Sequence, residues 1–333
     1  MLIAGREVAL TNQDKVFFPD LRVTKGDLVD WYVGVADAIL PHVTRRPAQM
    51  KRYPNGVEGD FFYQKRVPVP HPEWLATVHI EFPSGRSADF PVLNDPAALA
   101  WFANLGCIEI HTWHSRADDV ERPDYLLIDL DPSAEGQWRA VREITLVTRE
   151  VMTELGLAPY VKTSGSTGMH ILAPISRDLE FPEVRRFAKA MAKMIEARVP
   201  RIATTTWAVK DRTGVFVDYG QNARDRTIAS AYSVRPVPDA RVSAPLEWDE
   251  VAAVEPGDLT IATMPARMRK VGDLTAGMWE KAVSIAGLFD RVGEKPPGHG
   301  PKPRKRTGEG PWRDWRAEHQ AKYEERKKAA RKG

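Results

Sequence analysis

The chain of 333 residues contains a single cysteine, Cys107. One cysteine excludes internal disulfides and cysteine-based zinc sites, and it fits a reducing cytoplasm, where we expect this protein to reside. The sequence also lacks an apolar run of the roughly 18–20 residues that cross a membrane, and its N-terminus lacks a signal-peptide pattern. Internal repeats are absent as well. We therefore expect a globular, cytoplasmic protein that does not bind membranes.

Most of the chain has no excess of basic over acidic residues, and the excess lies at its C-terminal end. The net charge is +3, yet residues 291–333 hold fourteen Lys/Arg against six Asp/Glu, and the other 290 residues hold 34 against 39. A near-neutral body with a basic tail indicates a polyanion as partner. A disordered tail that only improves solubility would have the same composition. Charge alone leaves both interpretations open.

Composition changes along the chain predict three parts. We expect a catalytic domain over residues 1–290, a basic Pro/Gly-rich linker over 291–311, and a basic Trp-containing helix over 312–333. In the predicted helix the aromatic positions recur every three to four residues, which gives one aromatic stripe. That helix either docks on the body or lies along nucleic acid.

Residues 125–132, Tyr-Leu-Leu-Ile-Asp-Leu-Asp-Pro, are the stretch on which the functional prediction rests. An apolar run closed by Pro132 is typical of a strand buried on both faces. Alternate side chains of a strand share a face, so Asp129 and Asp131 should lie close together. Two such carboxylates repel each other unless a cation lies between them, and carboxylate oxygens suit Mg²⁺ or Mn²⁺. Alternatively, one aspartate caps the following helix and the other is solvated.

A second apolar strand, predicted over residues 214–219, also ends in a carboxylate, Asp218. A third aspartate at a strand end is the ligand that a site for two metal ions would still need. Further along, Arg235 could clamp a phosphate or could be an ordinary charge at the rim.

Two other segments carry polar side chains among apolar ones. In residues 161–175 a strand breaks at a loop of Ser, Thr and Gly residues and resumes before His170. Such a loop can surround an anion, although the segment taken alone favours an ordinary hairpin turn. In the strand predicted over 107–113, alternation places Glu109, His111 and Trp113 on one face. That polar face suggests a cleft, while a structural, hydrogen-bonded histidine is the other interpretation.

The N-terminal part combines lysines with aromatic residues. Lys15 and Lys25 flank a turn at Pro19 that leads into a helix capped by Thr24. Residues 50–66 are predicted to form strand, turn and strand, with cationic ends around the aromatic residues 61–63. Cations for phosphates and aromatic faces for bases are what single-stranded nucleic acid requires. Since neighbouring strand residues point to opposite sides, only part of the aromatic trio should be available for stacking.

The remaining elements are predicted from hydrophobic periodicity. We expect a hairpin over residues 76–94 and three helices, over 96–105, 138–155 and 182–198.

Taken together in chain order, these motifs resemble the polymerase domain of bacterial DNA ligase D, a member of the archaeo-eukaryotic primase superfamily. The resemblance covers about residues 5–275. It rests on Thr-Asn-x-Asp-Lys-Val, Lys-Arg-Tyr-Pro-x-Gly, Gln-Lys, Glu-x-His-x-Trp, Asp-Leu-Asp-Pro, Thr-Ser-Gly-x-x-Gly-x-His, Phe-Val-Asp and Tyr-Ser-x-Arg.

The resemblance implies an α/β (α+β) fold: a primase-like core of two abutting mixed sheets, flanked by helices, with a central cleft. It assigns the catalytic and metal-binding roles, for two Mn²⁺ or Mg²⁺ ions, to Asp129, Asp131 and Asp218. Nucleotide binding is assigned to His111, Ser164, Arg235, Lys51, Thr167 and His170. Lys15 and Lys25 match lysines that hold a DNA 5′-phosphate, and Phe62 and Tyr63 match a pair that stacks on template bases. Thr167 departs from the family pattern, in which this loop position is often a lysine.

The implied activity is that of a DNA-dependent primase-polymerase that extends primers and fills short gaps in DNA repair, in end joining or excision repair. The substrates implied are gapped or primer–template DNA and ribo- or deoxyribonucleoside triphosphates, with ribonucleotides preferred and a downstream 5′-phosphate recognised. The ligase signature Lys-x-Asp-Gly is absent, so we expect a separate ATP-dependent DNA ligase as partner. We also expect the protein to be a monomer. A metal-dependent nuclease and a non-catalytic nucleic-acid-binding subunit are the alternatives.

Overall fold

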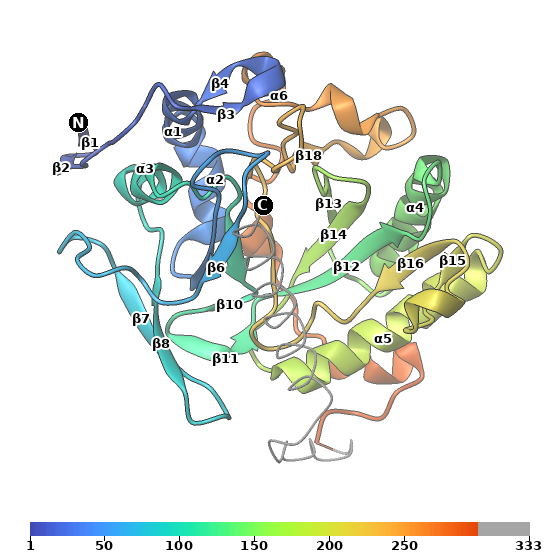
Figure 1. The fold of residues 1–333 in the computed structure, drawn as a ribbon. Helices are drawn as coiled ribbons and strands as arrows, with labels where there is room; N and C mark the ends of the chain where they lie inside the picture. Colours follow the sequence, from blue (N-terminus) through green and yellow to red (C-terminus); the bar gives the residue numbers. More distant parts are fainter. Residues whose placement is uncertain (299–333) are drawn as a thin grey trace, which may run out of the picture. The chain divides into compact units, whose positions relative to one another are not determined.

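A computed structural model describes residues 1–298 of the chain (Figure 1). Most of the predicted linker and the helix predicted over 312–333 lie outside the described residues. Contacts separate residues 80–88, the tip of a hairpin, from the body formed by residues 1–79 and 89–298. The functional residues predicted from the sequence all belong to this body.

Among the described residues, two sheets have more than two strands, and the larger of them has six. It is built around β12 (Tyr125–Pro132), whose first six residues are buried. Antiparallel neighbours flank it, β14 (Met169–Pro174) on one side and β16 (Val215–Asp218) on the other. The sheet continues with β13 (Tyr160–Thr163) and β18 (Pro245–Leu246) beyond β14, and with β15 (Ala203–Thr204) beyond β16. β15 runs parallel to β16, so this sheet is mixed, as predicted.

The second sheet has the strand order β17 (Thr227–Ala229), β9 (His111–Trp113), β5 (Ala48–Arg52) and β6 (Phe62–Gln64). All its pairings are antiparallel, so the expectation of two mixed sheets holds for the larger sheet alone. The two sheets meet where Lys162 Nζ on β13 donates a hydrogen bond to the Ala229 carbonyl on β17, at 2.9 Å.

The strand predicted over residues 107–113 begins only at His111. Side chains take the place of a strand partner before it: Tyr32 Oη donates to the Ile108 carbonyl at 2.7 Å, and the Ile110 N–H donates to Ser233 Oγ at 2.8 Å. Because these backbone groups already have hydrogen-bond partners, the segment does not need to pair with a neighbouring strand. Trp113 lies two residues after His111 on β9, and its ring is buried against Phe90.

Two long helices cover the larger sheet and pack against each other (Figure 1). They are α4 (Trp138–Glu154) and α5 (Phe181–Arg198), and both were predicted from their apolar stripes. Thr24 caps α1 (Lys25–Gly34) through a capping box with Asp27, as the sequence indicates. The other helices are α2 (Ala36–Val43), α3 (Pro96–Asn104) and α6 (Met264–Val271).

Short strands complete the described chain. They form three further pairs and the predicted hairpin: β1 (Leu2–Ile3) with β2 (Arg6–Glu7), β3 (Val16–Phe18) with β4 (Val23–Thr24), β10 (Ser115–Arg116) with β11 (Asp119–Pro123), and β7 (Thr77–Glu81) with β8 (Ser87–Pro91). Within residues 1–298, no helix combines the length and apolar character that crossing a bilayer requires.

The predicted boundary at residue 290 falls inside a 3₁₀ helix, Ala286–Val292. The first residues of the predicted linker contact the long helices: Arg291 Nη2 donates to the Glu154 carbonyl at 2.6 Å, and the Gly298 N–H donates to Glu183 Oε1 at 3.2 Å. The division of the chain at this point stays a prediction.

Candidate metal and nucleotide site

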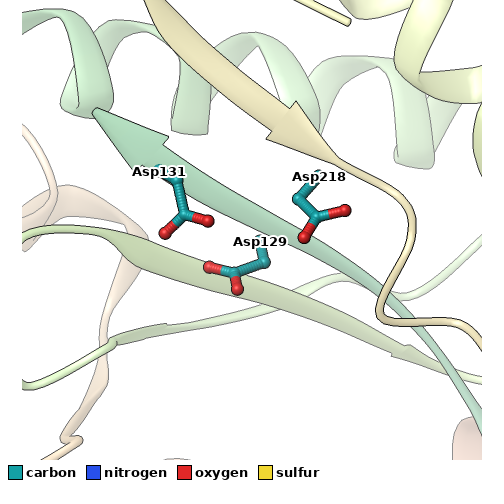
Figure 2. A group of neighbouring side chains, drawn as sticks. All are labelled: Asp129, Asp131 and Asp218. Carbon is teal, nitrogen blue, oxygen red and sulfur yellow. The ribbon is translucent and has the colours of Figure 1, made fainter. Parts of the chain in front are cut away.

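The three predicted aspartates meet in the middle of the larger sheet (Figure 2). Asp129 and Asp131 lie two residues apart on β12, and Asp218 at the end of β16 is the direct antiparallel partner of Asp129. One carboxylate oxygen from each residue lies within 4.8 Å of those of the other two. The alternative role for one aspartate as a helix cap is wrong, because α4 begins after Gln137 and has no side-chain cap.

Without a bound cation, burial and mutual repulsion make the charged forms of the three aspartates unfavourable. Burial raises the pKa of Asp131 to about 7, and repulsion from Asp129 and Asp218 adds to the effect. Burial likewise raises the pKa of Asp129 to about 6, although the positive charges of Lys162 and Arg235 oppose it. The pKa of Asp218 is raised for the same two reasons, burial and the charge of Asp129. An all-oxygen carboxylate donor set fits a hard divalent cation such as Mg²⁺ or Mn²⁺, which would remove this repulsion.

Neighbouring groups hold Asp218 in place. The Gly220 N–H donates to Asp218 Oδ1 at 2.5 Å, and Gln221 Nε2 donates to Oδ2 at 3.1 Å. A Cβ at position 220 would lie 2.9 Å from that same Oδ1 and 2.7 Å from the ring of Trp207, so a larger residue there would displace the Asp218 carboxylate or the Trp207 ring. The sequence analysis did not assign a role to this glycine, although it directly follows the Phe-Val-Asp-Tyr stretch.

A buried chain of polar groups lies behind Asp129. His170 Nε2 is 3.3 Å from Asp129 Oδ1, and its other ring nitrogen, Nδ1, is 2.5 Å from Lys162 Nζ. Lys162 also donates to Ser243 Oγ at 2.6 Å. Burial lowers the pKa values of both Lys162 and His170. With both ring nitrogens engaged, His170 is placed to orient a metal ligand, whereas the sequence analysis assigned it to nucleotide binding.

Three of the predicted nucleotide-binding residues contact one carboxylate, that of Glu109. Lys51 Nζ lies 2.8 Å from Glu109 Oε1, while His111 Nε2 and Arg235 Nε lie 2.9 Å and 3.3 Å from Oε2. Arg235 also adds positive potential at Asp129. The structure therefore brings the predicted phosphate-binding cations and the predicted metal ligands within electrostatic reach of one another.

The Ser/Thr/Gly loop is the turn of the β13–β14 hairpin. Ser164 Oγ accepts hydrogen bonds from the N–H groups of Ser166 and Gly168, both at 3.1 Å, which closes the loop on itself. A Cβ at Gly168 would lie 2.1 Å from the Leu130 carbonyl, and one at Gly165 would lie 2.5 Å from Arg235 Cγ. The loop thus fits between β12 and Arg235, beside the aspartates, while the Thr167 side chain is exposed.

The predicted 5′-phosphate ligands lie together at the N-terminal end of the body. The Lys25 N–H donates to the Lys15 carbonyl at 2.8 Å. Lys15 Nζ donates to the Pro54 carbonyl at 2.7 Å, and Lys25 Nζ donates to the Asn104 carbonyl at 3.0 Å. Burial lowers the pKa of Lys25, and the charges of Lys15 and Arg52 lower it further. Arg52, which the sequence analysis placed among the cations around the aromatic residues and not with these lysines, is therefore a third positive charge near them.

All three residues of the aromatic trio are accessible to solvent. Phe61, Phe62 and Tyr63 are 48%, 44% and 61% exposed, so the expectation that one of them would enter the core is wrong. β6, which carries two of them, is the edge strand of its sheet and Phe61 precedes it. Lys51 Nζ lies 4.3 Å from the centroid of the Phe61 ring. Lys51, which also contacts Glu109, therefore connects the aromatic trio with that carboxylate.

Comparisons with known proteins agree with this geometry. The family model for the LigD primase-polymerase domain matches residues 24–275. The multifunctional non-homologous end joining protein LigD of Mycolicibacterium smegmatis is 34% identical over 272 residues, which are 81% of this chain and 36% of that protein. LigD of Mycobacterium tuberculosis H37Rv is 31% identical over 296 residues, 86% of this chain and 38% of that protein. The chain thus spans little more than a third of these relatives.

Among solved structures, the polymerase domain from M. tuberculosis ligase D in complex with DNA superimposes with a TM-score of 0.77. Its sequence identity is 30%, and the match covers 83% of this chain and 99% of that domain.

Proposed function

Because this chain belongs to the family of LigD primase-polymerase domains, we propose that it is a DNA-repair polymerase that adds nucleotides to primer ends in end joining and fills short gaps. Members of this family are nucleotidyltransferases. The observation that carries the proposal is the meeting of Asp129, Asp131 and Asp218 beside the cations bound to Glu109. Neither group alone would place a triphosphate next to metal ions.

The residues of the site have distinct roles in the proposed mechanism. Asp129, Asp131 and Asp218 would hold two Mn²⁺ or Mg²⁺ ions, which would supply activation of the primer hydroxyl and neutralisation of the leaving pyrophosphate. Gly220 and Gln221 keep the Asp218 carboxylate directed at the site. Arg235, His111 and Lys51 hold the triphosphate, together with Ser164 and Thr167 on the hairpin loop. Position and charge, more than covalent chemistry, account for the acceleration.

The proposed nucleic-acid substrate is gapped or primer–template DNA. The M. tuberculosis relative is described in complex with DNA, and this chain has aromatic and cationic groups suited to the same ligand. We assign template stacking to Phe62 and Tyr63, and binding of a downstream 5′-phosphate to Lys15 and Lys25. Preference for ribonucleotides, a monomeric state in the cytoplasm and a separate ATP-dependent ligase as partner complete the proposal.

A primer-extension assay tests the proposal. A labelled primer on a gapped duplex is incubated with Mn²⁺ or Mg²⁺ and with ribo- or deoxyribonucleotides, with and without a 5′-phosphate downstream. A polymerase lengthens the primer, a metal-dependent nuclease shortens it, and a non-catalytic binding subunit leaves it unchanged. The Asp129→Ala/Asp131→Ala variant is the control, and extension by that variant equal to the wild type would contradict the assignment.

A further inference from the structure

The Glu109 carboxylate is enclosed by the residues that it binds. Its side chain is 1% exposed, whereas those of Lys51, His111 and Arg235 are 18%, 21% and 20% exposed. These three partners come from β5, from β9 and from the segment after β17, so Glu109 joins three parts of the chain. The carboxylate lies underneath, and the cationic groups extend from it toward the surface.

This environment fixes the charge of Glu109. Burial by itself would raise the pKa of Glu109, but the charge and hydrogen bond of His111 and the charges of Arg235 and Lys51 outweigh it and hold the pKa well below its usual range. Glu109 is therefore an anion whenever the protein is folded near neutral pH. The buried anion also restricts the rotamers of Lys51, His111 and Arg235, because each loses its contact with the carboxylate if it turns away.

A second buried carboxylate in the same body shows a different arrangement. Asp124 binds Arg46 and Arg116, at 2.6 Å for each, but the Arg46 side chain is 0% exposed. That cluster connects internal parts of the fold. At Glu109, in contrast, all three partners are partly exposed, and each contacts the carboxylate through one nitrogen, while Lys51 and Arg235 carry further N–H donors.

We propose that Glu109 is a positioning residue for the nucleotide: it holds Lys51, His111 and Arg235 in the arrangement that receives the triphosphate. Burial holds the pKa of His111 below its usual value, so Lys51 and Arg235 carry the positive charge here. Against the single negative charge of Glu109 they leave an excess of one positive charge, which complements a metal-bound triphosphate. Glu109 itself repels phosphate, so it acts only through its partners. This inference rests on the proposed function, because it names how the same site prepares its nucleotide-binding half.

The test compares the full-length wild type with Glu109→Gln, which keeps the shape and removes the charge. We expect the KM for ATP in primer extension to rise by about tenfold or more, with kcat changed much less, since the metal ligands are untouched. Equilibrium binding of a fluorescent ATP analogue in Ca²⁺ should weaken by a similar factor. Glu109→Asp, which keeps the charge on a shorter side chain, should give intermediate values for both.

The matched control is Asp124→Asn, which removes the other buried carboxylate with two cationic partners. It should lower the melting temperature while leaving the KM for ATP unchanged. An unchanged KM and analogue affinity in Glu109→Gln would overturn the inference, as would equal KM increases in both variants. If Glu109→Gln fails to fold, Glu109→Asp decides, because a KM equal to the wild type would overturn the inference.

A wild type that binds the analogue but does not extend primers would contradict the proposed function instead. Binding of the analogue by the variants would still test the role of Glu109.

Discussion

Asp129 on β12 and Asp218 on β16 are direct partners in an antiparallel ladder, although they are far apart in the sequence. Cross-strand partners share a face of the sheet, and Asp131 lies on this face as well because it is two residues from Asp129. Strand pairing alone therefore concentrates three carboxylates in one place. The backbone determines where the three carboxylates meet, and neighbouring side chains such as Gln221 orient them.

The first prediction concerns the stability that the protein loses because these three carboxylates repel one another. Replacing Asp131 with Asn removes a charge that is repelled by both Asp129 and Asp218, so the metal-free protein should become more stable at pH 8. We expect a rise in melting temperature of roughly 2–4 °C for each kcal/mol of repulsion removed, together with loss of primer extension. Differential scanning fluorimetry in EDTA measures the first effect.

Addition of Mn²⁺ should reverse the order of stability. The ion binds the folded wild type and raises its melting temperature, while Asp131→Asn should respond much less because it lacks one ligand. Asp119→Asn, which alters an exposed carboxylate paired with Arg122, serves as the control and should respond to Mn²⁺ like the wild type. An equal Mn²⁺ response in Asp131→Asn and wild type would contradict the site.

The second prediction separates two roles for His170. If this residue orients Asp129, then His170→Gln should weaken Mn²⁺ binding and leave binding of a fluorescent ATP analogue in EDTA nearly unchanged. Loss of a residue that orients a metal ligand typically costs about 10–100-fold in metal affinity. Titration of Mn²⁺ followed by electron paramagnetic resonance provides the measurement. A direct nucleotide contact, as first assigned from the sequence, would give the opposite pattern.

The sequence was sufficient to bring the three aspartates together, because each belongs to a strong local pattern. β12 and β16 are apolar runs that end in aspartates, and the alternation of a strand then specifies which side chains share a face. Lys162 and Glu109 were not assigned roles for the opposite reason. Each gains its role from partners on other elements, such as His170 for Lys162 and Arg235 for Glu109, and local periodicity does not report such contacts.

The aromatic trio shows a second limit of local patterns. Alternation predicts one inward residue in any adjacent pair, but this rule assumes that one face of the strand is covered. Phe61 lies before the strand, and Phe62 and Tyr63 lie on the edge strand β6. Tertiary position therefore decided their exposure.

The third prediction concerns the N-terminal cations. Lys15→Ala/Lys25→Ala removes two of three neighbouring positive charges, so the preference for a gap with a 5′-phosphate over one without should disappear. Extension on an open primer–template should persist, because the aspartates are unaffected. Arg291→Ala, which removes a cation near α4, is the matched control. Retention of the phosphate preference in the double variant would exclude these lysines as the 5′-phosphate ligands.

The fourth prediction follows from the low pKa of Glu109. A carboxyl group whose pKa is lower in the folded than in the unfolded state contributes stability above its unfolded pKa, and this contribution is lost as the pH falls toward the folded pKa. The wild type should therefore exceed Glu109→Gln in free energy of unfolding at pH 7, and the difference should shrink below about pH 4.5. Urea denaturation at pH 7.0 and pH 4.0 checks the sign. A difference that grows on acidification would contradict it.

The last prediction concerns Phe62 and Tyr63, which are exposed and so contribute little to the core. Replacing both with Ala should change the free energy of unfolding by less than about 1 kcal/mol, since surface substitutions usually stay within ~0.5 kcal/mol each. Stacking on a base is worth roughly 1–3 kcal/mol, so affinity for a single-stranded template overhang should fall by about 10-fold or more. Fluorescence anisotropy with overhang and blunt duplexes separates this effect from phosphate binding, because only the overhang offers unpaired bases. Val69→Ala, another exposed apolar side chain, is the control and should bind both duplexes like the wild type. Equal losses on the two duplexes would indicate that the aromatic pair contacts the duplex and not the template bases.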